Sequence, residues 1–305
     1  MEQPFGLLEL GSNSLKFYLV TPCASGGHML KTHKFPWTVA HDFFSTGRVA
    51  PSTLDGVLKT LHKVEEVSEG VPLATMLAVA TGIFRELPEI AVLGTRMKAE
   101  SGIRLRVITG EDEAKLMAKC LPREESEASV LLCDVGGATT EWAWIERGTG
   151  RAWGSLPLGA IRNQYRFREL QGSPSYLGES VRATDEVLSS LIVPPAGTRV
   201  MATGGTAKAA AKVTGSDIVS LDALRKLIET VLHEGPPPVL RPERQSVFLP
   251  GLVILERILV RAGAASLEHA MTSVRDGMAE RLIQLLGSHR REDLHSTLLL
   301  RTKGV

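Results

Sequence analysis

The order of apolar and polar runs along the chain predicts strands that alternate with helices. Two apolar runs, at 5–10 and 15–20, flank a short polar turn and predict a β-hairpin. Leucine and valine recur at helical spacing between residues 54 and 69, which predicts a helix there. The same pattern predicts strands at 73–80 and 104–108 and helices at 83–100 and 111–120. Such an alternation is typical of an α/β domain.

A polar, acidic stretch with a proline, at 122–129, interrupts the alternation, which then begins again. Beyond it the pattern predicts strands at 130–134, 141–146, 152–157 and 199–203, and helices at 160–170, 176–191, 221–234, 247–262, 274–286 and 293–303. Residues 134–139 repeat the pattern of residues 9–14, an acidic residue at a strand end followed by a Gly/Ser/Thr turn. We therefore expect two α/β domains with mixed sheets. Their predicted ranges are 1–123 and 124–288, with a final helix at about 289–305 that joins the first domain.

Composition narrows the class of protein. The chain has 305 residues, 43% hydrophobic and 23% charged, which is ordinary for a soluble globular protein of roughly two domains. No apolar run approaches the roughly 18–20 residues of a membrane span, and the first residues do not fit a signal peptide. The net charge of +1 lacks the basic field of a general nucleic-acid binder. We expect a cytoplasmic protein that binds neither membrane nor nucleic acid.

Cysteine and histidine give no sign of a metal site. Cys23, Cys120 and Cys133 are isolated, without CxxC spacing, and the eight histidines are scattered. This pattern fits neither a disulfide framework nor a zinc site. We interpret the three cysteines as ordinary reduced residues.

Three turns rich in glycine and hydroxyl groups follow apolar strands. Their sequences are GSNS at 11–14, GGATT at 136–140 and TGGT at 203–206. Glycine lets the backbone approach an anion closely, so that successive N–H groups and hydroxyls can hold phosphate oxygens. One such turn alone is a weak signal, because tight turns need glycine in any case. Three of them, two after a carboxylate, favour a phosphate-binding site.

The acidic residues beside these turns point to a metal ion. Glu9, Asp134 and Glu141 lie where the two halves of a duplicated fold would face each other. Carboxylates directed at phosphates repel them unless a hard cation lies between, so Mg²⁺ or another divalent cation is expected. Lys16, in an otherwise apolar strand, is a candidate phosphate contact. Arg85, taken by itself, fits a surface position better than an anion site.

A third acidic group opens the helix predicted from residue 111. Residues 111–113 are Glu-Asp-Glu and directly follow Thr109-Gly110. Acidic residues stabilise helix N-termini electrostatically and through capping, which accounts for about two of the three. The pattern alone does not assign a functional role to any of them.

The chain resembles the exopolyphosphatase/guanosine-pentaphosphate phosphohydrolase (Ppx/GppA) family in eight ordered segments between about residues 5 and 285: GSNS, ATGIFRE, ITGEDEAKLM, CDVGGATTEW, GSLPLGAIR, ATGGTA, SVFLPG and SVRDGM. The resemblance implies an α/β fold of two ribonuclease-H-like domains, of the actin/sugar kinase/Hsp70 superfamily, with an interdomain cleft. It implies the short form of the family, without further helical domains. The implied activity is metal-dependent hydrolysis of terminal phosphoanhydride bonds in inorganic polyphosphate or guanosine pentaphosphate, with a link to the stringent response. It also implies a homodimer, although the residues themselves leave the oligomeric state open.

The resemblance implies roles for individual residues. Glu113 falls on the family's catalytic glutamate, the base that activates water, and Asp134 and Glu141 fall on the acids that position metal and water. The expected metal ligands are Glu9, Asp134 and Glu141. The phosphate-binding set predicted from the turns and the resemblance together is Gly11, Ser12, Asn13, Ser14, Lys16, Arg85, Gly136, Gly137, Ala138, Thr139, Gly204, Gly205 and Thr206.

Three departures from the family pattern separate two functional hypotheses. Glu9 replaces the usual Asp, Ala138 replaces the third glycine of its turn, and residues 82–84 replace small residues. The leading hypothesis is a hydrolase, because Glu113 and the Asp134/Glu141 pair are kept. The alternative is a weakly active or inactive relative that binds guanosine tetra- or pentaphosphate, or polyphosphate, as a sensor. An ATP-dependent kinase would need a sugar- or acid-binding pocket, for which the sequence has no signature.

Overall fold

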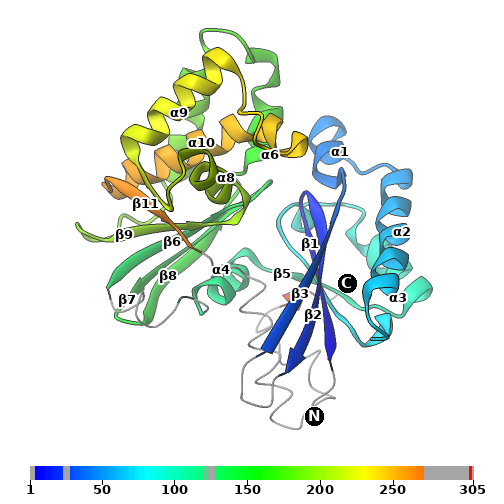
Figure 1. Cartoon of the computed structure of the whole chain (residues 1–305). Helices are drawn as coiled ribbons and strands as arrows, with labels where there is room; N and C mark the ends of the chain where they lie inside the picture. The colour runs from blue at the N-terminus through cyan, green and yellow to red at the C-terminus, as the bar shows by residue number, and fades with distance from the viewer. Residues whose placement is uncertain (1–3, 23–27, 120, 122–127, 271–301, 304–305) are drawn as a thin grey trace. The chain divides into compact units, whose positions relative to one another are not determined.

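The chain forms two compact units. The structure is a computed structural model that describes residues 4–22, 28–119, 121, 128–270 and 302–303 (Figure 1). Unit 1 comprises residues 1–113 and 275–305, and unit 2 comprises residues 114–274. The division falls at 113/114, inside helix α4 (Gly110–Ala118), whereas the sequence predicts 123/124. Glu113 is the last residue of the first segment of unit 1, and its carboxylate pairs with Arg85 of the same unit.

Unit 1 is built on a mixed sheet of strand order β12-β5-β4-β1-β2-β3. Its strands are β1 (Phe5–Gly11), β2 (Ser14–Pro22), β3 (His28–Pro36), β4 (Leu77–Ala80), β5 (Leu105–Ile108) and β12 (Thr302–Lys303). The first three are antiparallel, β4 and β5 run parallel to β1, and β12 is antiparallel to β5. The predicted hairpin is therefore confirmed. The final helix is wrong at residues 302–303, which form a strand on β5, and residues 271–301 lie outside the described residues.

The helices of unit 1 follow the predicted periodicity with one interruption. They are α1 (Val39–Thr46), α2 (Pro51–Val67), α3 (Ile90–Ser101) and α4, with short 3-10 turns η1 (Leu73–Thr75) and η2 (Gly82–Arg85). The predicted apolar face of α2 is buried and packs on the core. The helix predicted at 83–100 is divided into η2 and α3. Pro88 lies between the two and disfavours a helical conformation at the residue before it.

Unit 2 repeats the sheet of unit 1. Its strand order is β10-β11-β9-β6-β7-β8, with strands β6 (Ser129–Val135), β7 (Thr140–Glu146), β8 (Thr149–Leu156), β9 (Arg199–Thr203), β10 (Ile218–Ser220) and β11 (Ser266–His269). Again three strands are antiparallel, two continue in parallel and a last strand is antiparallel. This is the ribonuclease-H-like topology, present twice. The predicted α/β fold with two mixed sheets is confirmed, and the duplication extends to the whole sheet.

Helices cover the second sheet and supply most of its core. They are α6 (Ala160–Arg166), α7 (Tyr176–Leu188), α8 (Gly204–Thr214), α9 (Leu221–Glu234) and α10 (Pro242–Ala262), with the 3-10 turn η3 (Arg168–Leu170). Figure 1 shows α8, α9 and α10 over one face of the sheet. The apolar core joins leucines, valines and isoleucines of α10 to β6, β9 and α9. None of the helices in the described ranges has the length and apolar character needed to cross a membrane.

Candidate functional site

The predicted site residues gather at one edge of each sheet. In unit 1, residue 11 ends the strand β1, and residues 81–82 and 109–110 directly follow β4 and β5, which run parallel to it. In unit 2, residues 136 and 204 directly follow β6 and β9. Ligands of open α/β sheets bind at the carboxyl ends of the strands, where the loops expose backbone N–H groups. The interdomain cleft stays a prediction.

The glycine loop, residues 136–139, joins β6 to β7, and the carbonyl groups of residues 136–138 all accept hydrogen bonds from the start of α6. It is closed by a hydrogen bond from Gly136 N to Thr139 O, 2.9 Å. The carbonyls of Gly136 and Gly137 accept backbone N–H groups from the start of α6, at 2.8–3.0 Å. In a trans peptide the N–H points opposite to the preceding carbonyl. The N–H groups of residues 137–139 therefore point away from α6, which is the arrangement that holds an anion.

Two carboxylates flank this loop. Asp134 and Glu141 are opposite each other in the β6–β7 ladder, so that their side chains share one face. Ser155 Oγ donates to Glu141 Oε1 at 2.7 Å, and Thr139 Oγ1 donates to Oε2 at 3.4 Å. Oxygen atoms of carboxylates and hydroxyls are the ligands preferred by Mg²⁺, which is often held by one or two carboxylates and substrate phosphates.

The third turn lies directly against Asp134. Gly204 has a positive φ of 84°, and a Cβ at this position would collide with Asp134 Oδ1. Only glycine therefore satisfies both the backbone conformation and the close approach. Thr206 was predicted to contact phosphate, but its side chain is buried and packs against Gly251 of α10.

Arg244 is a site residue that sequence analysis missed. It lies in the first turn of α10, and its guanidinium packs on Gly205, where any Cβ would collide with it. Burial lowers the pKa of Arg244, and the charges of Glu243 and Asp134 oppose this shift. A half-buried guanidinium beside a glycine turn is a strong partner for a phosphate. The available signal was the Pro-Glu-Arg sequence that opens α10.

In unit 1 the first turn is fixed by the segment that follows β3. Trp37 Nε1 donates to Gly11 O at 2.9 Å, Ala40 N to Ser12 O at 3.2 Å, and Trp37 N to Asn13 O at 3.3 Å. Ser12 Oγ accepts the N–H of Ile83 at 3.2 Å. The carbonyls of this turn, like those of the glycine loop, are thus directed toward one helix start.

Glu9 and Lys16 were assigned to a metal and to a phosphate, but they pair with each other. Lys16 Nζ lies 2.6 Å from Glu9 Oε1, and Tyr18 Oη donates to Oε2 at 2.8 Å. A divalent cation on this carboxylate would lie close to an ammonium group, which is electrostatically unfavourable. The contacts of Glu9 therefore do not fit a metal ligand, whereas those of Asp134 and Glu141 do. Within the described residues, no group of three His, Cys, Asp or Glu side chains could hold a metal ion.

Glu113 and Arg85, the predicted base and a predicted phosphate contact, form an ion pair. Arg85 is held in place because its Nε also donates to Ile108 O at 3.0 Å. Asp112 instead pairs with Thr109, whose Oγ1 donates to Asp112 Oδ2 at 2.8 Å and accepts from Asp112 N at 3.1 Å. Asp112 is therefore a capping residue, as predicted for the helix-start acids, and Glu113 is the buried acid with a cationic partner.

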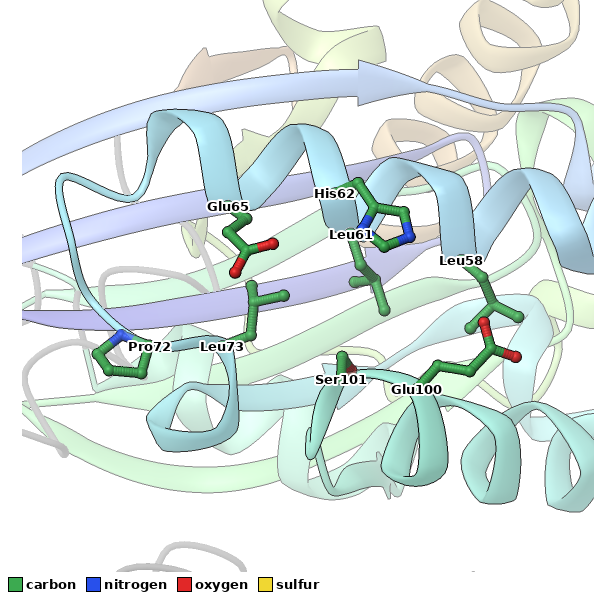
Figure 2. Close-up of a pocket in the computed structure, with 8 residues that line it drawn as sticks. All are labelled: Leu58, Leu61, His62, Glu65, Pro72, Leu73, Glu100 and Ser101. Atoms are coloured by element: carbon green, nitrogen blue, oxygen red, sulfur yellow. The ribbon is translucent and has the colours of Figure 1, made fainter.

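Two further features lie apart from these turns. Cys133 is buried, and burial together with the charge of Asp134 raises the pKa of its thiol to about 12, so it is unreactive near neutral pH. Cys23 and Cys120 lie outside the described residues. Figure 2 shows a cavity of about 310 Å³ between α2, η1 and α3, lined by Leu58, Leu61, His62, Glu65, Pro72, Leu73, Glu100 and Ser101. It contains none of the predicted site residues.

Comparison with known proteins relates the chain to one family of phosphatases. The model of the Ppx/GppA phosphatase family matches residues 24–285. Exopolyphosphatase 1 of Mycobacterium tuberculosis H37Rv is 27% identical over 161 residues, which cover 52% of this chain and 46% of the relative. Guanosine-5'-triphosphate,3'-diphosphate pyrophosphatase of Aeromonas hydrophila is 23% identical over 301 residues, which cover 93% of this chain and 60% of the relative. The chain thus spans about half to three fifths of the length of these relatives.

Two solved structures share the fold over nearly the whole chain. An exopolyphosphatase from Cytophaga hutchinsonii superposes with a TM-score of 0.80 at 18% identity, covering 92% of this chain and 98% of that one. A Ppx/GppA family member from Aquifex aeolicus gives a TM-score of 0.74 at 18% identity, with the same coverage. At such identities, the likeness establishes the fold.

Proposed function

Because the chain belongs to the Ppx/GppA phosphatase family, we propose that it hydrolyses terminal phosphoanhydride bonds of inorganic polyphosphate, guanosine pentaphosphate or both. The observation that carries the proposal is the glycine loop, whose N–H groups face away from α6 beside Asp134 and Glu141. Phosphoryl transfer requires mainly positioning and neutralisation of charge, which oriented N–H groups and a guanidinium supply. Arg244 on Gly205 adds the guanidinium.

In the proposed reaction a water oxygen forms a bond to the terminal phosphorus, and the bond from that phosphorus to the bridging oxygen breaks. The leaving group is the shortened polyphosphate or guanosine tetraphosphate. Glu113 accepts the proton of the attacking water, which is the role of a general base. The phosphate charge attracts Arg85, the present ion-pair partner of Glu113.

We propose Mg²⁺, or another divalent cation, as the metal. Asp134 and Glu141 would hold it, since both belong to the oxygen-rich edge formed with Thr139 and Ser155. When bound, the ion would neutralise charge on the phosphate oxygens. Glu9 is left out of this set because it is already paired with Lys16.

The function is tested by phosphate release from purified polyphosphate and from guanosine pentaphosphate, with Mg²⁺ and with excess EDTA. We expect release that requires the metal from at least one substrate. Binding of both compounds with no release in either condition would instead establish the sensor alternative. Absence of both binding and release would remove the proposed substrates altogether.

The sensor alternative is favoured by the Glu9–Lys16–Tyr18 contacts, since this carboxylate is engaged within the protein. The other departure, Ala138, does not favour it. Ala138 is fully buried, so its methyl group packs on protein atoms and is not presented to a ligand. We therefore do not expect this methyl group to crowd a bound phosphate.

Ala138→Gly is accordingly expected not to raise turnover or tighten polyphosphate binding. It removes a buried methyl group and adds backbone freedom in the unfolded chain, so the free energy of unfolding should fall by about 1–2 kcal/mol. Chemical denaturation and a polyphosphate titration measure the two effects. Faster turnover or tighter binding in the variant would show that the methyl group limits the site.

Other properties implied by the family are kept as proposals. They are a homodimer, a cytoplasmic location, a link to the stringent response, and the absence of nucleic-acid and membrane partners. Size-exclusion chromatography with light scattering determines the first of these directly.

A further inference from the structure

Three successive carbonyl groups of the glycine loop are held by one short segment of chain. Ala160 N donates to Gly136 O at 2.9 Å, and the backbone N–H groups of Ile161 and Arg162 donate to Gly137 O at 2.8 and 3.0 Å. The third carbonyl, of Ala138, accepts from the side chain of Arg162, through Nε at 2.8 Å. Backbone N–H groups therefore hold the first two carbonyls of the series, and the side chain of Arg162 holds the third.

Close packing makes this contact specific to the local sequence. Gly159, directly before α6, has an extended φ of −156°, which any residue can adopt. A Cβ at Gly159 would nevertheless lie 2.5 Å from the carbonyl carbons of Gly137 and Ala138. Real Cβ atoms do not approach backbone so closely, so glycine is required here by space and not by conformation. Residues 159–162 and the glycine loop therefore pack as one unit.

Unit 1, the other half of the duplicated fold, holds its turn carbonyls in the same way but with a different side chain. In unit 1 the segment after β3 holds the carbonyls of residues 11–13, and Trp37 Nε1 supplies the side-chain contact, to Gly11 O. In unit 2 the segment after β8 holds residues 136–138, and Arg162 supplies it. Both segments follow the third strand of their sheet. The recurrence in two halves of different sequence indicates a function for the arrangement rather than chance packing.

We propose that Arg162 is a positioning residue. By holding Ala138 O, its Nε fixes the peptide plane between Ala138 and Thr139, so that the N–H of Thr139 faces a bound phosphate. This inference rests on the proposed function, which supplies the ligand, a terminal phosphate. The role concerns the bond from Nε to the carbonyl and assigns no phosphate contact to Arg162. Hydrogen bonds to a charged group are among the strong ones, so a single freed peptide should lower the affinity for polyphosphate by about 10-fold.

The first test needs no ligand. In the free protein, Arg162→Met is expected to shift the amide ¹H–¹⁵N resonances of Ala138 and Thr139. The control Arg166→Met removes an exposed arginine from the same helix and should leave them in place. Gly159→Ala should shift the same resonances by displacing the loop directly. Unmoved loop resonances in Arg162→Met would overturn the proposal. If that variant does not fold, Gly159→Ala and the milder Arg162→Lys decide the outcome.

The second test separates positioning from direct binding. In a Glu113→Gln background, which prevents turnover, polyphosphate affinity is expected to fall about 10-fold in Arg162→Met and to be unchanged in Arg166→Met. A loss of affinity with unmoved amide resonances would make Arg162 a direct ligand and would also overturn the proposal. Failure of the function itself is recognised separately, as an absence of phosphate release from the unmodified protein.

Discussion

Replacement of Glu113 by Gln is expected to lower phosphate release by about 10²–10⁴-fold, the usual contribution of a positioned general base. Gln keeps the size and hydrogen-bonding shape of the side chain but cannot accept the proton of the attacking water. Glu113 is buried, in the first part of α4, and pairs with Arg85. A guanidinium and a helix N-terminus both favour the ionised carboxylate that a base requires.

The affinity for polyphosphate should be retained in Glu113→Gln, because the substitution removes none of the proposed phosphate contacts and leaves Arg85, the ion-pair partner of Glu113, in place. Steady-state phosphate release and a binding titration measure the two quantities. Glu111→Gln is the matched control, since Glu111 is an exposed acid on the same helix. Phosphate release by Glu113→Gln at a near-parent rate would contradict the assignment. Glu141 would then be the next candidate for the base.

Asp134→Asn should remove most of the dependence on Mg²⁺ and lower activity by at least about 10²-fold, since preorganised charge is the largest single contribution in such sites. Asp134 ends β6, directly before the glycine loop, and its Oδ1 lies against Gly204. Asn has the same shape and can keep this contact, so the fold should remain. Losing the carboxylate also removes a charge that raises the pKa of Arg244.

The measurements are phosphate release as a function of Mg²⁺ concentration, and thermal unfolding. Asp185→Asn serves as the control, because Asp185 pairs with Arg257 at 2.7 Å in the same unit and lies outside the predicted site. An Asp134→Asn protein that unfolds, with unchanged residual turnover, would show that the carboxylate is structural.

The parts of the fold that sequence predicted are those with a strong local period. The apolar face of α2 and the hairpin of β1 and β2 are confirmed because each is encoded within a few neighbouring residues. β3 and α1 were not predicted. β3 is an edge strand with Lys31 and Lys34, a composition that protects sheet edges but hides the apolar alternation of a strand. β10 and β11 are only three and four residues long, which is too short for a period.

In the candidate site, too, some features were predicted from neighbouring residues and others were not. Glycine turns and acids at strand ends were predicted because each is a property of consecutive residues. The pairing of Lys16 with Glu9, the packing of Arg244 on Gly205 and the bond from Arg162 to Ala138 were not. The last two join segments that meet only through the sheet topology, so no local pattern records them. Lys16 and Glu9 are opposite each other in the predicted hairpin, and their pairing depends on the register of its two strands.

The antiparallel pairing of β12 with β5 joins Thr302 to Ile108, and this has a consequence for how the chain is made. All the strands of unit 2 come from residues 129–269, so every strand of that sheet has been synthesised before residue 302 is added. The strands of the second sheet are therefore available for pairing before β12 has been made. Until then the outer edge of β5, on which β12 pairs, is uncovered. An uncovered strand edge pairs readily with other chains. Newborn protein therefore passes through a stage at which the earlier half of the sequence is the later one to be completed.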